Sequence, residues 1–453
     1  MSTLKTNNIE HLDGSSPSIQ IGVGGGVNIS GVVTATSFDG DVTGNINSSG
    51  ISTLSNVVVG GATTELVVTG DARITGILTV GTASVTLNGT DGTITGINTI
   101  NGLAYPSAGP LSNRNLIING AMQVAQRNSS FVTASNNSNE GYQTLDRFGV
   151  VFASGAGGAC SIGQSVTVPS NQGFSNSYKL DVTTADTNIS ASHYIAVYQY
   201  LEAQDVRNSG WNYTNSSSYI TLSFWVRSSK AGTYCCNFRQ ENVSDRYYVF
   251  EYTLAADTWT KVTHSVPGDS SAVFNNDNGA GLRIGWMLQA GSSRDNATAN
   301  QWATSSGNAA TSNQVNFFDS TDNDFYLTGV QFEVGERVTP FEHRSYGDEL
   351  LRCNRYYAKV GGSRVTGGGG SSSAVTLTVS TPCEMRTTPD VEDVTINSMV
   401  RYDATGAGNL GSATGAVGVA RGSMYSVNIS NLTSVSDNRV YFSNCSFNLD
   451  AEL

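Results

Sequence analysis

Apolar and polar residues alternate with a period of two along much of the chain beyond residue 113, which predicts β-strands. One face of segment 220–227 is apolar, with Ile220, Leu222, Phe224 and Val226. The other face carries Thr221, Ser223, Trp225 and Arg227. Segment 282–288 repeats the pattern, and so does 326–334, where one face is expected to hold Tyr326, Thr328, Val330, Phe332 and Val334. Such strands, separated by loops rich in Asn, Ser and Gly, predict a β-sandwich.

One helical signal interrupts the strands. Segment 347–354 (Gly-Asp-Glu-Leu-Leu-Arg-Cys-Asn) has Asp348 and Glu349 in its first turn, where the helix dipole favours carboxylates. From residue 356 onward the chain again resembles β structure, with an expected Gly/Ser-rich break at 367–373 and with Pro382 and Pro389 limiting strands.

A short repeat marks the first 110 residues. The pentad Gly, β-branched aliphatic, any residue, Thr, small or aliphatic begins at Gly31, Gly50, Gly76 and Gly96. Turn signals such as Asp91-Gly92 lie between the copies. This region holds two of the 40 aromatic residues, too few large side chains for a monomeric core, yet it is rich in Val, Ile and Thr. It therefore predicts a fibrous β segment that obtains its core from other copies of the chain; coincidental Gly/Thr-rich low complexity is the alternative.

Composition and charge narrow the function classes. Only 13 % of the residues are charged, and the formal net charge is −12. This balance argues against nucleic acid, whose binding needs clustered Lys and Arg, and against docking on an anionic membrane. No run of 18 apolar residues predicts membrane insertion, and the first ten residues lack the apolar segment of a signal peptide, so synthesis in the cytosol is expected.

The spacing of the cysteine and histidine residues indicates neither a disulfide framework nor a zinc site. The six cysteines (Cys160, Cys235, Cys236, Cys353, Cys383 and Cys445) show no C-x-x-C pattern, and the four histidines are not paired at ligand spacing. Cys235 and Cys236 are neighbours on an expected strand, so their side chains should point to opposite faces. Buried, reduced thiols are expected rather than disulfides or zinc.

Four motifs, in order, resemble the distal parts of bacteriophage tail fibre proteins, especially those of marine and cyanobacterial phages. They are 113–127 with Asp146-Arg147-Phe148; 222–228; 327–335 with 339–345 and Arg355-Tyr356-Tyr357; and 385–389, before a closing Ala451-Glu452-Leu453. The resemblance implies a homotrimeric fibre whose sandwich is like a carbohydrate-binding module. The family often has Trp where this chain has Phe148. Such modules often hold calcium through a carboxylate of the last strand, where this chain has Thr328.

Aromatic residues in polar, loop-like surroundings are the candidate receptor site, because sugars are bound by stacking on rings. Trp211, Tyr213 and Trp302 meet this description, and Tyr402 and Tyr425 are the next candidates. A half-buried lid is the alternative for the two tryptophans. Trp225, Trp259 and Trp286 lie in strand patterns and are interpreted as core or outer-sheet packing.

The acidic residues of segment 319–324 are the candidate metal site. Asp319, Asp322 and Asp324 offer oxygen ligands of the kind that calcium prefers, with a solvated turn as the alternative. Asp146-Arg147 reads either as an ionic ligand site or as a loop anchor. The sequence shows no nucleophile elbow and no phosphate-binding loop, so no enzyme activity and no cofactor are expected.

The combined prediction is an all-β, elongated homotrimeric fibre located in the virion tail. It assigns 1–25 to attachment to a phage tail or baseplate protein, 26–108 to a trimeric β-repeat shaft, 109–345 to a jelly-roll-like sandwich and 346–453 to a short helix and a β tip. The expected function is adsorption to host surface polysaccharide through several weak sites acting together. A tailspike that cleaves polysaccharide and a purely structural spacer are the alternatives.

Overall fold

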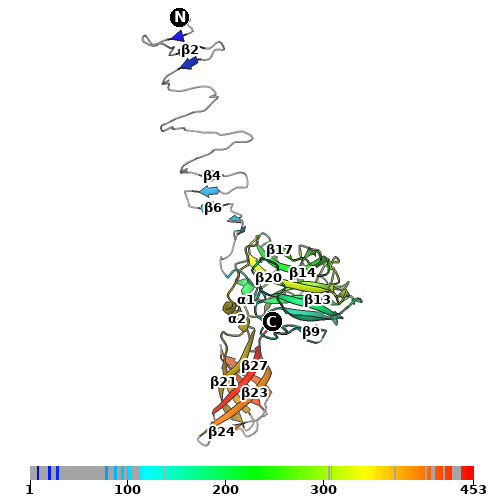
Figure 1. The fold of residues 1–453 in the computed structure, drawn as a ribbon, viewed down its shortest axis with the longest axis vertical. Coiled ribbons are helices and arrows are strands. Elements are labelled where there is room, and N and C mark those ends of the chain that lie inside the picture. The colour runs from blue at the N-terminus through cyan, green and yellow to red at the C-terminus, as the bar shows by residue number, and fades with distance from the viewer. Residues whose placement is uncertain are drawn as a thin grey trace. The chain divides into compact units, whose positions relative to one another are not determined.

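The computed structural model (Figure 1) describes residues 113–453 except 137, 244, 305–306, 308, 372–373, 404–405, 410–413, 422–423 and 431–439. Before residue 113 it describes eight short strands. For these strands, and for several strand residues beyond 361, it describes the backbone but not the side chains. The chain divides into two compact units, Met1–Thr75 and Gly76–Leu453. Within the described residues, no helix is long and apolar enough to span a bilayer.

The short strands before residue 113 form three small antiparallel sheets. They are β1 (Asn8–Ile9), β2 (Ile19–Ile21) and β3 (Val27–Ile29); β4 (Ile77–Thr79), β5 (Thr86–Asn88) and β6 (Thr93–Thr95); and β7 (Thr99–Ile100) with β8 (Leu103–Ala104). The pentads at Gly76 and Gly96 overlap β4 and β7, and Asp91-Gly92 lies between the paired strands β5 and β6. The pentads at Gly31 and Gly50 lie outside the described residues.

Two antiparallel six-stranded sheets form a sandwich, which confirms the predicted all-β class and the sandwich. The front sheet consists, in order, of β17 (Thr260–Pro267), β14 (Tyr219–Ser228), β20 (Asp324–Val334), β12 (Ser177–Thr184), β11 (Ala159–Ser165) and β9 (Val132–Ser135). The rear sheet consists of β10 (Gly149–Ala153), β13 (Tyr194–Glu202), β18 (Ala280–Ala290), β15 (Gly232–Gln240), β16 (Arg246–Leu254) and β19 (Trp302–Thr304). Two short helical turns, α1 (Ala203–Arg207) and η1 (Phe317–Asp319), join strands.

The core of the sandwich follows the predicted alternation on β14 and β18. The inward side chains of both strands belong to one apolar cluster, with Trp286 packed between Phe148 and Phe224 at centroid distances of 6.0 and 5.8 Å. His264 is also turned inward, and its ring stacks on Phe250 with centroids 4.1 Å apart. Cys236 lies in this core while Cys235 lies on the opposite face, as predicted; the five cysteines whose side chains are described (all but Cys445) are free thiols.

The predicted face of β20 is wrong in its first half. Phe325 and Leu327 point into the core, whereas Tyr326 and Thr328 face outward, and the pattern then shifts so that Val330 and Phe332 are again inside. Gly329, with φ of +61°, adopts the left-handed conformation where the pairing with β14 changes register. A β-bulge of this kind inserts one residue and reverses the alternation, which a strict period of two does not anticipate.

The C-terminal part forms one seven-stranded antiparallel sheet with its own apolar core. Its order is β24 (Gly406–Asn409), β23 (Asp390–Asp403), β27 (Val440–Asp450), β21 (Tyr357–Ser371), β22 (Ala374–Ser380), β26 (Met424–Ser430) and β25 (Thr414–Arg421). Pro382 and Pro389 lie between β22 and β23, as predicted, and the break expected at 367–373 is narrower than predicted, because β21 continues to Ser371 and β22 begins at Ala374. Glycine is needed inside this strand, since a Cβ at Gly367 would lie 2.0 Å from the carbonyl oxygen of Thr376.

The predicted helix is confirmed as α2 (Tyr346–Asn354), which precedes the C-terminal sheet. The hydroxyl of Ser345 caps it by accepting from the backbone N–H of Asp348. Asp348 and Glu349 lie in its first turn, as the dipole argument requires.

A buried ionic cluster joins the sandwich to the C-terminal sheet. The guanidinium of Arg147, 1 % exposed, pairs with Glu452, donates to the carbonyl oxygen of Tyr200 and lies 3.5 Å from the ring centroid of Tyr356. Arg127 pairs with Glu452 at 3.3 Å and with Asp450 at 2.6 Å. The loop-anchor interpretation of Asp146-Arg147 is thereby confirmed, with different partners for the two residues.

The remaining members of this cluster complete its hydrogen bonds. Asp146 accepts from the backbone and side-chain N–H groups of Gln126 at 2.8 and 2.6 Å, while burial raises the pKa of Asp146 to about 6. Glu202 accepts from Arg355 at 2.6 and 2.8 Å and from the Tyr356 hydroxyl at 2.6 Å. Burial opposes ionisation of Glu202, but these hydrogen bonds outweigh it and lower the pKa.

We expect Glu452→Gln to lower the free energy of unfolding by about 3–5 kcal/mol, because the variant leaves Arg147 buried without its counter-charge. Urea unfolding measures this change. Asp257→Asn is the matched control, since the Arg227–Asp257 pair is exposed (61 % at the Asp257 side chain) and should contribute less than about 1 kcal/mol. Equal losses in the two variants would contradict the role given to Glu452.

The half-buried ring of His264 predicts a second, pH-dependent effect. Burial lowers its pKa to about 4, whereas the unfolded chain titrates near 6.5. The unfolded state therefore binds more protons than the folded state between these pH values. The contribution of His264 to the free energy of unfolding is fully present above pH 6.5 and is lost as the pH drops toward 4. We expect a loss of about 2 kcal/mol from this group, allowing for partial solvent screening. His264→Phe should flatten the pH profile of urea unfolding; an unchanged profile would contradict this assignment.

Candidate functional site

Trp211 is not the exposed platform expected from its polar surroundings. Its side chain is 3 % exposed, and its indole N–H donates to the carbonyl oxygen of Ser218 at 3.2 Å. Its ring and that of the half-buried Tyr213 pack against Phe274, at centroid distances of 6.4 and 5.0 Å. The segment closes one end of the sandwich core, which corresponds to the lid alternative.

Trp302 lies in a strand rather than in the expected loop. It belongs to β19, pairs with Tyr248 of β16 and is half-buried. Its indole N–H donates to the carbonyl oxygen of Pro267 at 2.8 Å, and its ring lies 5.3 Å from that of Tyr248. The indole N–H of Trp302 is therefore already hydrogen-bonded within the protein. A role for Trp302 in binding stays a prediction.

The two further aromatic candidates lie in the C-terminal sheet. Tyr425 is 2 % exposed, and its hydroxyl accepts from the backbone N–H of Met385 at 2.9 Å, so the structure contradicts an exposed ring there. Tyr402 belongs to β23, and its side chain lies outside the described residues.

The acidic turn does not assemble a cation site. Asp319 pairs with Lys230 at 2.6 Å, and Asp324 accepts from the hydroxyl of Tyr326 at 3.0 Å, while Asp322 is exposed. In the part of the chain that the structure describes, no group of three or more His, Cys, Asp or Glu residues is placed to hold a metal ion. These contacts favour the alternative of a solvated, hydrogen-bonded turn, and a calcium site at Asp319, Asp322 and Asp324 stays a prediction.

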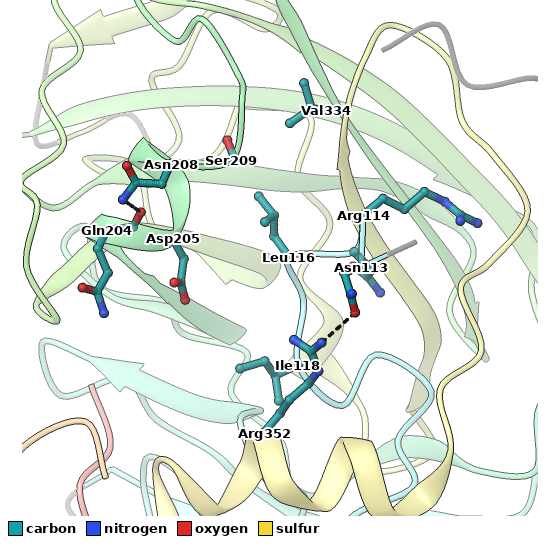
Figure 2. A pocket seen from close by; sticks show the side chains of 11 residues that line it. Asn113, Arg114, Leu116, Ile118, Gln204, Asp205, Asn208, Ser209, Val334 and Arg352 are labelled. Atoms are coloured by element: carbon teal, nitrogen blue, oxygen red, sulfur yellow. Dashed lines mark hydrogen bonds between the residues drawn. The ribbon is translucent and has the colours of Figure 1, made fainter. Parts of the chain in front are cut away.

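Figure 2 shows a polar cavity of about 440 Å³ between α1, the segment 113–118 and α2. Arg352 donates to the side-chain oxygen of Asn113 at 3.0 Å, and Asn208 donates to the carbonyl oxygen of Gln204 at 2.8 Å. Leu116, Ile118 and Val334 supply the apolar part of the wall. Of the described residues that line this cavity, none is aromatic, so it offers no surface for stacking.

A second cavity, the aromatic cleft, has about 410 Å³ and lies on the outer face of the front sheet. It is lined by Gln172, Phe174, Ser223, Trp225, Lys261, Gly329, Val338, Thr339, Pro340, Phe341 and His343. Ser223 and Trp225 are the outward residues of β14, and Lys261 of β17 is the direct cross-strand partner of Trp225. The remaining lining residues come from Gly329 of β20 and from the segments 172–174 and 338–343.

Three rings besides Trp225 gather in the aromatic cleft. Phe174 packs edge-on against Phe341 with centroids 5.0 Å apart, and His343 lies 5.3 and 4.9 Å from these two rings. All of them except His343, which is exposed, are half-buried. Partial desolvation lowers the pKa of His343, which favours the neutral imidazole, a group that can both donate and accept a hydrogen bond.

Gly329 lets Phe174 and Trp225 meet on the sheet surface. A Cβ at this position would lie 2.6 Å from the Cζ atom of Phe174 and 3.0 Å from the Cδ1 atom of Trp225. The bulge that overturned the predicted face of β20 therefore also creates the cleft. The sequence placed Trp225 correctly on an outward face but contained no signal that would bring Phe174 and Phe341 to it.

Hydrogen bonds join three of the motif segments into a structural frame, and residues of 222–228, 327–335 and 339–345 also line the aromatic cleft. The side chain of Asn115 donates to the carbonyl oxygen of Val330 at 3.1 Å and accepts from the N–H of Phe332 at 3.0 Å. Glu342 accepts from the N–H of Asn115 at 2.8 Å, and Arg344 donates to the carbonyl oxygen of Ile117 at 3.0 Å. The segments 113–118, 327–335 and 339–345 thus bond to one another beside the ionic cluster.

No family model matches the chain, and no curated protein matches it in sequence. Among solved structures, it is similar to a candidate sugar-binding protein from Bacteroides thetaiotaomicron (12 % identity, 49 % of this chain and 100 % of that one, TM-score 0.28). It is also similar to a CBM4 structure (12 % identity, 48 % and 98 %, TM-score 0.26) and to a cyclase from Fischerella (9 % identity, 52 % and 100 %, TM-score 0.25). Likenesses at this level carry no conclusion about function.

We expect Gly329→Ala to destabilise the protein more than Gly210→Ala. Both glycines have positive φ, +61° and +89°, so each substitution pays backbone strain of about 1–2 kcal/mol. Only at Gly329 does the new Cβ also meet two rings, adding about 1–3 kcal/mol of overpacking, whereas nothing lies within 4 Å of it at Gly210. Urea unfolding of both variants measures the difference, and equal losses would contradict close packing of Phe174 and Trp225 over Gly329.

Proposed function

We propose that this protein binds a saccharide in the aromatic cleft and, as a homotrimeric phage tail fibre, attaches the virion to polysaccharide on the host surface. The observation that carries the proposal is the pair of rings, Phe174 and Trp225, set over Gly329 with polar groups at the rim. Aromatic faces stack on the C–H faces of pyranose rings. The Lys261 ammonium, the Gln172 amide and the His343 imidazole can bond hydroxyl groups.

The composition of the cleft favours binding over hydrolysis. Glycoside hydrolysis ordinarily requires two carboxyl groups on either side of the bond that is cut. Of the described residues that line the cleft, none is Asp or Glu. A site without an acid, a base or a nucleophile of this kind can hold a saccharide but has no group to cleave it, so we propose no enzymatic step.

The virion role rests on the ordered motifs at 113–127, 222–228, 327–345 with 355–357, and 385–389. The second of these contributes Trp225 to the cleft and the third contributes Gly329, Phe341 and His343, while the first is hydrogen-bonded to the third in the frame. A fibre with three copies of a weak site would bind with an avidity orders of magnitude above that of one site. The aromatic-poor repeat region before residue 110 supports the trimer, because strands without large side chains need other copies to bury them.

Trp225→Ala should lower the affinity for the bound saccharide about 2- to 10-fold per site, the range for loss of one stacked ring. An array of bacterial capsular and O-antigen polysaccharides identifies the ligand, and titration calorimetry with an oligosaccharide derived from it measures the affinity. Trp259→Ala is the matched control, since Trp259 is half-buried and packs on Tyr326 without lining the cleft. Unchanged binding by Trp225→Ala, or equal loss in both variants, would remove the cleft from the proposal. Release of reducing ends from the ligand would instead indicate a tailspike.

We expect the full-length protein to have three times the mass of one chain in multi-angle light scattering at micromolar concentration. The expectation follows from the repeat region, whose core would have to be shared between copies. A monomeric mass would contradict the fibre assignment while leaving saccharide binding by the cleft to be judged on the Trp225→Ala result.

A further inference from the structure

Four residues of the rear sheet lie directly opposite one another on its outer face. Tyr200 of β13 pairs with Arg283 of β18, Arg283 with Arg239 of β15, and Arg239 with Tyr247 of β16. We call this set the arginine row. Direct cross-strand partners have Cβ atoms about 4.5–5.5 Å apart, so the row places two positive charges side by side between two tyrosines. Like charges in this position destabilise a sheet unless something neutralises them.

The charges of the arginine row are not balanced within the described part of the chain. Glu241 lies 3.5 Å from Arg239 and is, among the described residues, the one carboxylate within ion-pair distance of either arginine; at longer range it also interacts electrostatically with Arg283. Arg283 is 4 % exposed and has no such partner; its Nη1 is 3.5 Å from the Tyr194 hydroxyl, and its Nε has no hydrogen-bond acceptor. A buried guanidinium without a counter-ion is costly in the absence of a ligand, and its field acts strongly because water is largely excluded around it.

A tyrosine ring lies beside each guanidinium group of the row. The guanidinium carbons of Arg239 and Arg283 lie 5.8 and 6.0 Å from the ring centroids of Tyr247 and Tyr194, at the outer limit for cation–π attraction. The Arg239 side chain is 31 % exposed, so it is the group that an approaching molecule meets first. The rings offer stacking surface and hydroxyl groups beside that charge.

We propose that the arginine row binds the anionic group of an acidic saccharide, a carboxylate or a sulfate ester, at a site separate from the aromatic cleft. The anion pairs with the partly exposed guanidinium of Arg239 and adds negative charge beside Arg283, which among the described residues has no carboxylate within ion-pair distance. A guanidinium fork matches either oxyanion through two parallel hydrogen bonds. The flanking tyrosines suit a sugar ring next to the charge, and the net charge of −12 disfavours a long nucleic acid as the source of the anion.

Titration calorimetry on the full-length protein tests this site with three probes of equal length: a neutral dextran oligosaccharide, an oligogalacturonate and a sulfated dextran oligosaccharide. We expect one anionic probe to bind at least about tenfold more tightly than the neutral one, the contribution of one charge-assisted hydrogen-bond pair. The anionic probe that binds more tightly shows whether the site prefers a carboxylate or a sulfate ester. The preference should decline as salt is raised.

Arg239→Gln should abolish the preference for the anionic probe, and Arg239→Lys should keep part of it, because the charge stays and the fork is lost. Arg227→Gln is the control, since it removes the same charge from the front sheet, where Arg227 pairs with Asp257. Trp225→Ala should leave the preference unchanged, which separates this site from the cleft. Equal affinity for all probes, or equal losses in Arg239→Gln and Arg227→Gln, would overturn the proposal.

A purely structural role for the arginine row predicts the opposite effect of Arg239→Gln on the melting temperature. If the arginine row only stabilises the sheet, Arg239→Gln would lower the melting temperature more than Arg227→Gln and leave probe binding unchanged, which would also overturn the proposal. We expect instead that Arg239→Gln melts no lower than the control, since it removes the repulsion between adjacent guanidinium groups. The preferred anionic probe should raise the melting temperature of the native protein and not that of Arg239→Gln.

Discussion

The sandwich and the C-terminal sheet depend on one constraint, the neutralisation of the Arg147 guanidinium inside the protein. With 1 % of its surface exposed, Arg147 requires a carboxylate, a carbonyl oxygen and a ring face from different parts of the chain, namely Glu452, Tyr200 and Tyr356. None of these is its neighbour in sequence. The last residues must therefore return to the sandwich. The C-terminal sheet is attached there at the first residue of β21, Tyr357, which pairs with Asp450, the last residue of β27.

The front sheet shows how a backbone irregularity can produce a binding surface. A regular strand at β20 would place a side chain where Gly329 now allows Phe174 and Trp225 to approach each other. The rear sheet shows the opposite case, since its pairing is regular through the arginine row and the regularity itself sets two cations side by side. The two proposed surfaces therefore lie on opposite sheets and use different chemistry, ring stacking in one and charge pairing in the other.

The sequence predicted what depends on local periodicity. The strands β14 and β18, the helix α2 and the opposite faces of Cys235 and Cys236 follow from patterns within about ten residues. Prediction from the sequence fails where an inserted residue or a distant packing partner determines which face a side chain occupies or whether it is buried. The alternation predicts the wrong face for Tyr326 because the bulge at Gly329 reverses it, and the polar neighbours of Trp211 predict exposure where the ring in fact packs on Phe274. The aromatic cleft could not be assembled in advance, since Phe174, Trp225 and Phe341 meet only in the folded sheet.

The reach of the ionic cluster along the chain also affects how the protein acquires its structure. Arg147 and Glu452 are 305 positions apart, and the frame bond between Asn115 and Glu342 spans 227. Contacts of such long range form late, because the entropy of closing a large loop must be overcome before they stabilise anything. During that interval the open edges of the strands are exposed to pairing with neighbouring chains. The kinetic competition between closing this long loop and associating with other copies would then influence how much of the newly made chain reaches its folded state.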